Sequence, residues 1–247
     1  MNTFFESLIS SLPDGVLGNL VASAVAFTLG LVARWLWITL TLKRPAGRLW
    51  GVMAGKRVEI VMTTAPERSV DEHTALVYPA DAIAATEIAA VLTHTLKADC
   101  RLRLSNAIPA TTWDRNLIVI GGPVHNETTR KLLVDTGARV TFEGNTIVLE
   151  NGHRYLAETS VNERGETVID RDFGLVLRTP NPYRSSEFTT LLIGSQAPGC
   201  LVAARALLHE NIRSTSRSIS SPRRFGLVAS ARVVDGQVQE VSILESW

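Results

Sequence analysis

The sequence has few of the residues that build metal sites or disulfide frameworks. It contains two cysteines, Cys100 and Cys200, which form no CxxC pair and are too few for a disulfide framework. Both stand in apolar surroundings, which predicts small core residues in a reducing compartment. The five histidines are scattered and form neither an HxH nor an HExxH pattern. We therefore expect no metal site.

The sequence also has no marked excess of positive or negative charge. The chain has 25 Lys and Arg against 24 Asp and Glu, a formal net charge of +1, which argues against a nucleic-acid-binding surface. No GK[ST] or GxGxxG pattern occurs, so Walker A and dinucleotide-binding loops are not indicated. Ser195, between Gly194 and Gln196, does not stand in a GxSxG elbow. The sequence thus gives no catalytic set and no cofactor, and it leaves enzymatic activity open.

One long apolar run is present, from Leu17 to Leu42, with Arg34 as its single charge. About 20 apolar residues are enough to span a hydrocarbon core. We predict a transmembrane helix over 17–42, preceded by an extracytoplasmic segment 1–16. A cleavable signal peptide fits poorly, because the chain starts with acidic rather than basic residues and no small-residue cleavage site follows the run. A buried helix of a soluble protein is the other alternative.

Positive charge follows the apolar run at Lys43, Arg44 and Arg48. The positive-inside bias then predicts a single-pass protein of the inner membrane, with its amino terminus outside and its large domain in the cytoplasm. Trp35, Trp37 and Trp50 are expected to lie at or near the membrane interface.

A stripe of small residues at four-residue spacing runs along the apolar segment and ends in a cation. Such a face lets two membrane helices approach closely, so we expect a homo-oligomer within the lipid bilayer. Arg34 either lines a shared polar seam or pore, or reaches back to the headgroups. The stripe consists of Gly18, Ala22, Ala26, Gly30 and Arg34.

After a basic connector, 43–55, the rest of the chain (56–247) predicts one domain in which strands and helices alternate. The strands expected here are 57–63, 100–104, 116–120, 173–177 and 189–193, and the helices are 80–98, 126–134 and 200–210. This rhythm indicates an α/β fold: a Rossmann-like, mostly parallel sheet covered by helices.

Two parts of the domain depart from that rhythm. Residues 139–170 read as short alternating strands with glycine turns, which predicts an inserted antiparallel β meander. Residues 225–234 and 237–244, joined by Asp235-Gly236, predict a carboxyl-terminal β-hairpin. The Ser-rich basic stretch 213–224 is interpreted as a linker.

Two loops share one design, in which a buried strand ends in a glycine turn and a helix begins at once. The carboxyl ends of parallel strands are where open α/β sheets bind ligands, and free helix N–H groups favour an anion such as phosphate. The alternative is that the glycines only make turns and that Asn126 only caps the helix that follows. The candidate ligand-binding residues are Gly121, Gly122, His125 and Asn126 in the first loop, and Gly194, Ser195 and Gln196 in the second.

A third loop follows the strand 173–177 and contains Arg178, Asn181 and Arg184. Its two guanidinium groups suit bidentate phosphate contacts, although a solvated surface loop fits the same pattern. Asp81 and Glu87 are interpreted as an N-cap and a solvated side chain, or alternatively as contacts to a ribose or as acids. His125 is the best candidate for a general base.

The order of apolar helix, basic connector and the turns NLIVIGGPVHN and TTLLIGSQAPG resembles prokaryotic membrane-anchored sensors whose cytosolic Rossmann-like domain is of the CARF type. The resemblance implies binding of a nucleotide messenger and a response in the membrane helix, often in antiviral defence.

Three functions therefore follow as hypotheses. The first is a membrane sensor or effector that binds a phosphorylated, nucleotide-like small molecule. The second is a membrane-tethered enzyme that processes nucleotides or nucleosides. The third is an interaction module with a vestigial pocket.

Overall fold

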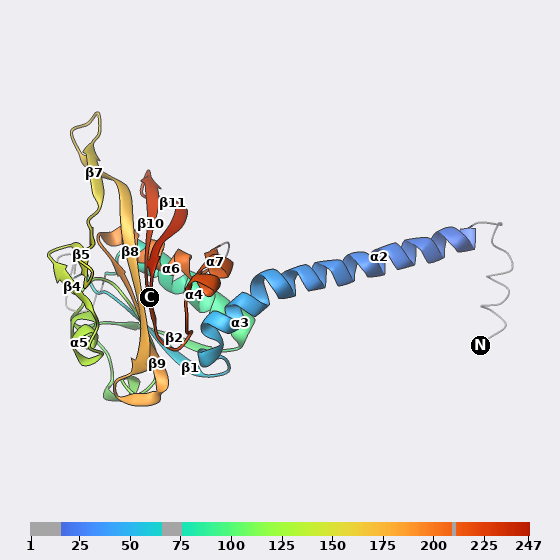
Figure 1. The fold of residues 1–247 in the computed structure, drawn as a ribbon, viewed down its shortest axis with the longest axis horizontal. Helices are drawn as coiled ribbons and strands as arrows, with labels where there is room; N and C mark the ends of the chain where they lie inside the picture. The colour runs from blue at the N-terminus through green and yellow to red at the C-terminus, as the bar shows by residue number, and fades with distance from the viewer. Residues whose placement is uncertain (1–15, 66–75, 209–210) are drawn as a thin grey trace. The chain divides into compact units, whose positions relative to one another are not determined.

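The computed structural model describes residues 16–65, 76–208 and 211–247 (Figure 1). The chain divides into two compact units, Met1–Arg44 and Pro45–Trp247. The candidate site lies in the second.

The first unit contains the apolar helix α2, Val16–Ile38, and a π-helical turn, Thr39–Lys43. The continuous helical stretch Ala22–Met53 is long and apolar enough to cross a membrane, and the mean hydropathy of its most apolar 18-residue window is 1.6. None of its most apolar window is buried, and Phe27 and Leu29 are 69% and 63% exposed. Such an uncovered apolar surface needs an apolar environment.

The predicted stripe lies on this helix. Ala22, Ala26, Gly30 and Arg34 are exposed, and their four-residue spacing puts them on one face of α2 together with the backbone of Gly18. An alanine Cβ built at Gly30 would meet no atom within 4 Å, so this face is open among the described residues.

The basic connector is helical and enters the core of the second unit. It forms α3, Arg44–Trp50, and a 3-10 turn, Gly51–Met53. The expectation that Trp50 lies near the membrane interface is wrong, because its ring is fully buried and its Nε1 donates to the Leu207 carbonyl at 3.3 Å. Apolar contact inside the domain outweighs the interfacial preference of indole here.

The main sheet of the second unit is mixed. Its strand order is β11-β10-β8-β9-β3-β1-β2, with β7 also paired to β8. The four strands β2, β1, β3 and β9 are parallel neighbours, whereas β8, β10 and β11 continue the sheet by antiparallel pairing. The strands are β1 Arg57–Met62, β2 Asp99–Leu104, β3 Asn116–Ile120, β7 Glu158–Val161, β8 Thr167–Asn181, β9 Arg184–Gly194, β10 Phe225–Val234 and β11 Gln237–Ser246.

Helices cover both faces of this sheet (Figure 1). One face carries α4 (Pro79–Leu96), α6 (Ala197–Ala206) and α7 (Ile212–Ser218), while the other carries α5 (Glu127–Asp135) and a small antiparallel sheet. That second sheet consists of β4 Val140–Glu143, β5 Thr146–Leu149 and β6 Arg154–Tyr155.

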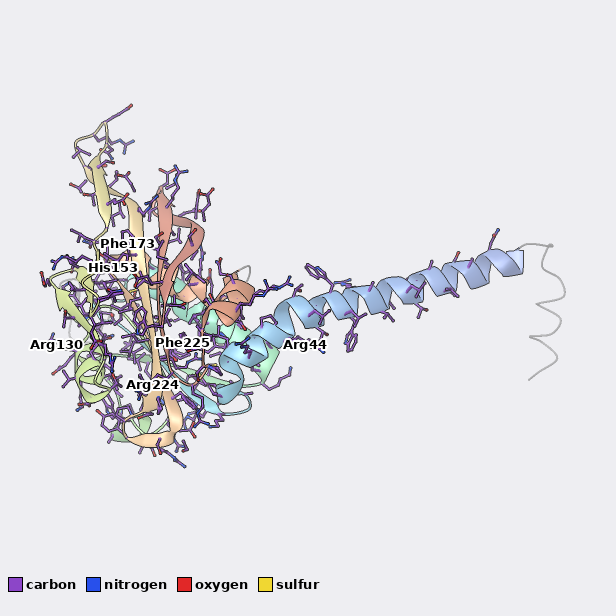
Figure 2. All side chains as sticks on the ribbon, in the orientation of Figure 1. Arg44, Arg130, His153, Phe173, Arg224 and Phe225 are labelled. Atoms are coloured by element: carbon purple, nitrogen blue, oxygen red, sulfur yellow. The ribbon has the colours of Figure 1, made fainter. Side chains whose placement is uncertain are left out.

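Each face has its own apolar core. Along β3, Ile118 packs with the α4 and α6 side, whereas Leu117 and Val119 pack with the α5 side, as strand alternation requires. Phe225 on β10 and Phe173 on β8, both labelled in Figure 2, likewise belong to opposite cores. A sheet buried on both faces explains the continuous apolar runs of its strands.

The fold is therefore α/β, with a mixed sheet in which most strands run in one direction, a small antiparallel sheet and the expected terminal hairpin. Two expectations need correction. The strand predicted at 173–177 is part of the 15-residue β8, which projects with β7 as a hairpin beyond the rest of the sheet (Figure 1). The linker predicted at 213–224 contains α7, whose Ile212 and Thr215 are buried.

Candidate functional site

The parallel half of the sheet has a topological switch point between β1 and β3. From β1 the chain passes through α4 to β2 on one side, and later returns as β3 on the other side of β1. The helix α4 that follows β1 and the helix α5 that follows β3 cover opposite faces. Helices that diverge in this way leave a crevice at the carboxyl ends of the two strands, where open α/β sheets bind ligands.

A cavity of about 170 Å³ occupies this crevice. Its lining comes from the residues that follow β1, β3 and β9, from the first turns of α4 and α6, and from the β4–β5 turn of the small sheet. Six of the ten residues predicted to bind a ligand line it: Gly121, Gly122, His125, Gly194, Ser195 and Gln196.

Gly121 is held in a backbone conformation that suits glycine. Its φ is +121°, and a Cβ there would overlap Thr63 Oγ1 and lie 3.3 Å from Asp81 Oδ2. Its amide donates to the Leu192 carbonyl at 3.0 Å, and its carbonyl accepts from Thr129 Oγ1 at 2.8 Å. The turn is therefore fixed on both sides, and the missing side chain keeps the cavity floor open.

Asn126 acts as the N-cap of α5. Its Oδ1 accepts from the Thr129 amide at 3.2 Å, while its Nδ2 donates to the Ile120 carbonyl at 3.1 Å and to Thr63 Oγ1 at 3.3 Å. The side chain is fully buried and is not part of the cavity lining. Of the two roles considered for Asn126, the structure shows the capping one.

The backbone amides of the second glycine turn bind a carboxylate from another part of the protein, that of Asp172 on β8. The two carboxylate oxygens of Asp172 accept hydrogen bonds from the Gln196 amide at 3.2 Å and the Gly199 amide at 2.6 Å, at the start of α6. Burial raises the pKa of Asp172 to about 6, and these backbone donors oppose the rise. The N-terminus of α6, expected to bind an anion, is thus already occupied by one.

Two lining residues of the glycine turns differ in exposure. Ser195 is buried, and its Oγ accepts the Ala157 amide at 3.0 Å, so its hydroxyl helps to hold the segment before β7. His125 is exposed, and its ring centroid is 6.4 Å from that of Tyr78, another lining residue. The two rings form an aromatic wall beside the glycines.

The loop expected to contain Arg178, Asn181 and Arg184 is largely strand, because Arg178 and Asn181 belong to β8 and Arg184 begins β9, and this segment does not join the two glycine turns. Since β8 runs antiparallel to β9, the residues that end β8 pair with those that begin β9, so they lie at the opposite edge of the sheet from Gly194. There, Asn181 Nδ2 donates to the Trp113 carbonyl at 2.8 Å, and Arg184 is exposed, 3.7 Å from an Asp114 carboxylate oxygen. Neither residue lines the cavity.

Arg178 is a buried structural residue. Its Nε donates to Thr190 Oγ1 at 2.9 Å and its Nη1 to the Leu49 carbonyl. The guanidinium carbon stands 4.4 Å from the ring centroid of Trp50 and 5.0 Å from that of Phe225. Burial lowers the pKa of Arg178 to about 9. The side chain thereby ties α3 to the middle of the sheet.

The two acidic candidates of α4 differ in environment. The N-cap interpretation of Asp81 is wrong, because Tyr78 occupies the N-cap position and Asp81 lies in the first turn, 1% exposed and in the cavity lining. Burial raises the pKa of Asp81. Glu87 instead pairs with Arg205, its Oε1 accepting from Nη2 at 2.8 Å, and it is not part of the lining.

Several lining residues were not predicted as ligand contacts. Thr63 and Cys200 sit at strand and helix ends next to the glycine turns, so the parallel-strand argument that identified those turns also locates them. Phe142, Gly144 and Asn145 come from the small sheet, and no local pattern indicates that this insert folds over the cavity.

No group of three or more His, Cys, Asp or Glu side chains suited to a metal ion occurs within residues 16–65, 76–208 and 211–247. No protein-family model matches the sequence, and no curated protein is significantly similar to it. The function has to be inferred from the cavity and from the apolar helix.

Proposed function

We propose that the chain is a membrane-anchored sensor that binds a nucleotide-like small molecule in the cavity between β1, β3 and β9. The observation that carries this proposal is the cavity's place at the carboxyl ends of parallel strands, at a switch point, between two glycine turns. The Tyr78 and His125 rings beside it offer an apolar wall for a planar base. The ligand is expected to contact the Gly121 and Gly194 turns and not Arg178, Asn181 or Arg184.

Binding is tested on the full chain in detergent with the four common nucleosides and their 5′-monophosphates. We expect at least one probe to raise the melting temperature in proportion to the logarithm of its concentration, since a ligand of the native state alone stabilises it by mass action. Gly122→Val adds a side chain to a residue of the cavity lining where a Cβ would make only ordinary contacts, 3.7 Å from the Gly194 carbonyl oxygen, and it should weaken this stabilisation. Gly47→Val in α3, where a Cβ would meet no described atom within 4 Å, is the control for general valine effects. Failure of every probe to shift the melting temperature refutes the proposal.

The sensor's output is proposed to be the assembly of α2 through its small-residue face. Gly30→Leu should weaken the oligomer, because the bulky side chain separates helices that pack through glycine. Ala24→Leu, two positions from the stripe and exposed on α2, is the matched control. Light scattering of the detergent-solubilised protein measures the mass, and an unchanged mass for Gly30→Leu contradicts the packing face.

One observation favours an enzyme as the second candidate. Asp81, whose pKa is raised by burial, and His125 line the same cavity and could act as acid and base. Mass spectrometry of each nucleoside and nucleotide after incubation distinguishes the two candidates, because a sensor returns its ligand unchanged.

A further inference from the structure

Asp81 has an unusual place in the cavity. It lies in the first turn of α4, it is 1% exposed, and it contributes to the cavity lining. Within the part of the chain that the structure describes, its Oδ2 has no hydrogen-bond partner. A buried carboxylate oxygen without a partner is energetically unfavourable, and buried polar groups of native proteins are rarely left so.

The donors closest to Asp81 belong to Thr63 and Cys200, and their hydrogen bonds oppose the rise that burial causes in the pKa of Asp81. The Thr63 hydroxyl donates to the Ile120 carbonyl at 3.0 Å, and the Asn126 amide group donates to that carbonyl and to Thr63 Oγ1. Gly121, which stands beside Oδ2, directs its amide to Leu192. These donors still leave Oδ2 without a partner among the described residues.

The described part of the cavity floor has an acidic side chain and no basic one. Among the described lining residues there is a carboxylate, that of Asp81, and neither lysine nor arginine. The start of α6, which would otherwise attract an anion, is taken by Asp172 through the Gln196 and Gly199 amides. A phosphate group placed on the floor would therefore face like charge without a compensating cation.

We propose that Asp81 recognises a hydrogen-bond donor on the uncharged end of the ligand, so that a hydroxyl- or amino-bearing nucleoside end enters the cavity first and any phosphate stays at the mouth. This inference rests on the proposed function. It names the end of the ligand that is recognised and the residue that recognises it, and it replaces the expectation of a phosphate held by the glycine turns.

The test compares Asp81→Asn with Glu87→Gln in the full chain, by isothermal titration with whichever of the four nucleosides binds best. Asp81→Asn keeps the size of the side chain and removes the carboxylate acceptor, so affinity should fall by about tenfold or more, as expected for the loss of a charged hydrogen bond. Glu87→Gln changes an acid of the same helix outside the cavity lining, and its affinity should stay within about twofold of the parent chain.

A competition measurement on the unaltered chain tests the same inference without a variant. Inorganic phosphate at millimolar concentration should not displace the nucleoside, and the nucleoside should bind at least as tightly as its 5′-monophosphate. Competition by phosphate, or unchanged affinity of a folded Asp81→Asn, overturns the inference and leaves the proposed function standing. Absence of binding by all nucleosides and nucleotides overturns both.

Discussion

Replacing Gly121 with alanine tests how the cavity is built. The new Cβ would overlap Thr63 Oγ1 and approach Thr63 Cβ to 3.0 Å, at a φ of +121° that residues with side chains rarely adopt. Such backbone strain costs about 1–3 kcal/mol. Forcing an extra methyl group into a packed site costs about 1–3 kcal/mol more. We expect Gly121→Ala to lose a large part of the stability of a typical domain.

The adjacent glycine supplies the matched control. A Cβ at Gly122 would lie 3.7 Å from the Gly194 carbonyl oxygen and 4.0 Å from Ile193 Cγ2, which are ordinary contacts. Gly122→Ala should therefore change the unfolding free energy by no more than about 0.5 kcal/mol. Urea denaturation of the full chain in detergent, followed by tryptophan fluorescence, measures both variants. If Gly121→Ala and Gly122→Ala unfold at the same urea concentration, the crowding deduced around Gly121 is wrong.

Three further predictions concern the surroundings of the site. For Asp172, the folded pKa of about 6 exceeds the unfolded value of 3.8, so its contribution to stability is present below pH 3.8 and is lost as the pH rises to 6. The difference in unfolding free energy between the parent chain and Asp172→Asn should therefore shift by about 3 kcal/mol over that range. A difference that stays constant with pH contradicts the raised pKa. Gly174→Ala should destabilise by about 1–3 kcal/mol, because its Cβ would lie 2.5 Å from the Gly199 carbonyl oxygen, whereas Gly47→Ala in α3, with no atom within 4 Å, should be neutral or slightly stabilising in the same melts. Arg178→Lys should lower the urea midpoint by leaving buried carbonyl and hydroxyl oxygens without their donor, while Arg184→Lys at the surface should not, and equal effects would refute the structural role of Arg178.

The parallel half of the fold was predictable because its signals are local. Each of β1, β3 and β9 contains a short apolar run, and the glycines that follow these runs in β3 and β9 mark where the strands end. Parallel neighbours bring such ends together, so six cavity residues could be named before their distances were known. The Asn126 cap followed from the same local reasoning.

The direction of β8 was not predictable in this way. An apolar run such as 173–177 has the same pattern whether its strand is parallel or antiparallel to its neighbour. Its pairing with β9 in a hairpin moves Asn181 and Arg184 to the opposite end of the strands and Arg178 to the middle of the sheet, opposite Thr190. The full burial of Arg178 against Trp50 depends on contacts between segments more than a hundred residues apart, which no local pattern contains.

The α7 helix was missed for a related reason. Serine-rich, basic sequence has low helix propensity and suits a linker. Long-range contacts stabilise α7 instead: Ile212 joins the core, and the Thr215 hydroxyl donates to the Ala206 carbonyl. Tertiary packing overrides the weak local preference.

The small sheet has a consequence for how the binding site can diversify. It supplies Phe142, Gly144 and Asn145 to one wall of the cavity. The cavity floor is formed by the parallel strands of the main sheet, to which the small sheet contributes none of the described strands. Its β4–β5 turn is a hairpin, a type of connection that tolerates changes of length and sequence. The wall can therefore be rebuilt by insertion or substitution in one contiguous segment while Asp81 and the glycine turns stay in place. Ligand preference and fold stability thereby depend on separate segments of the chain.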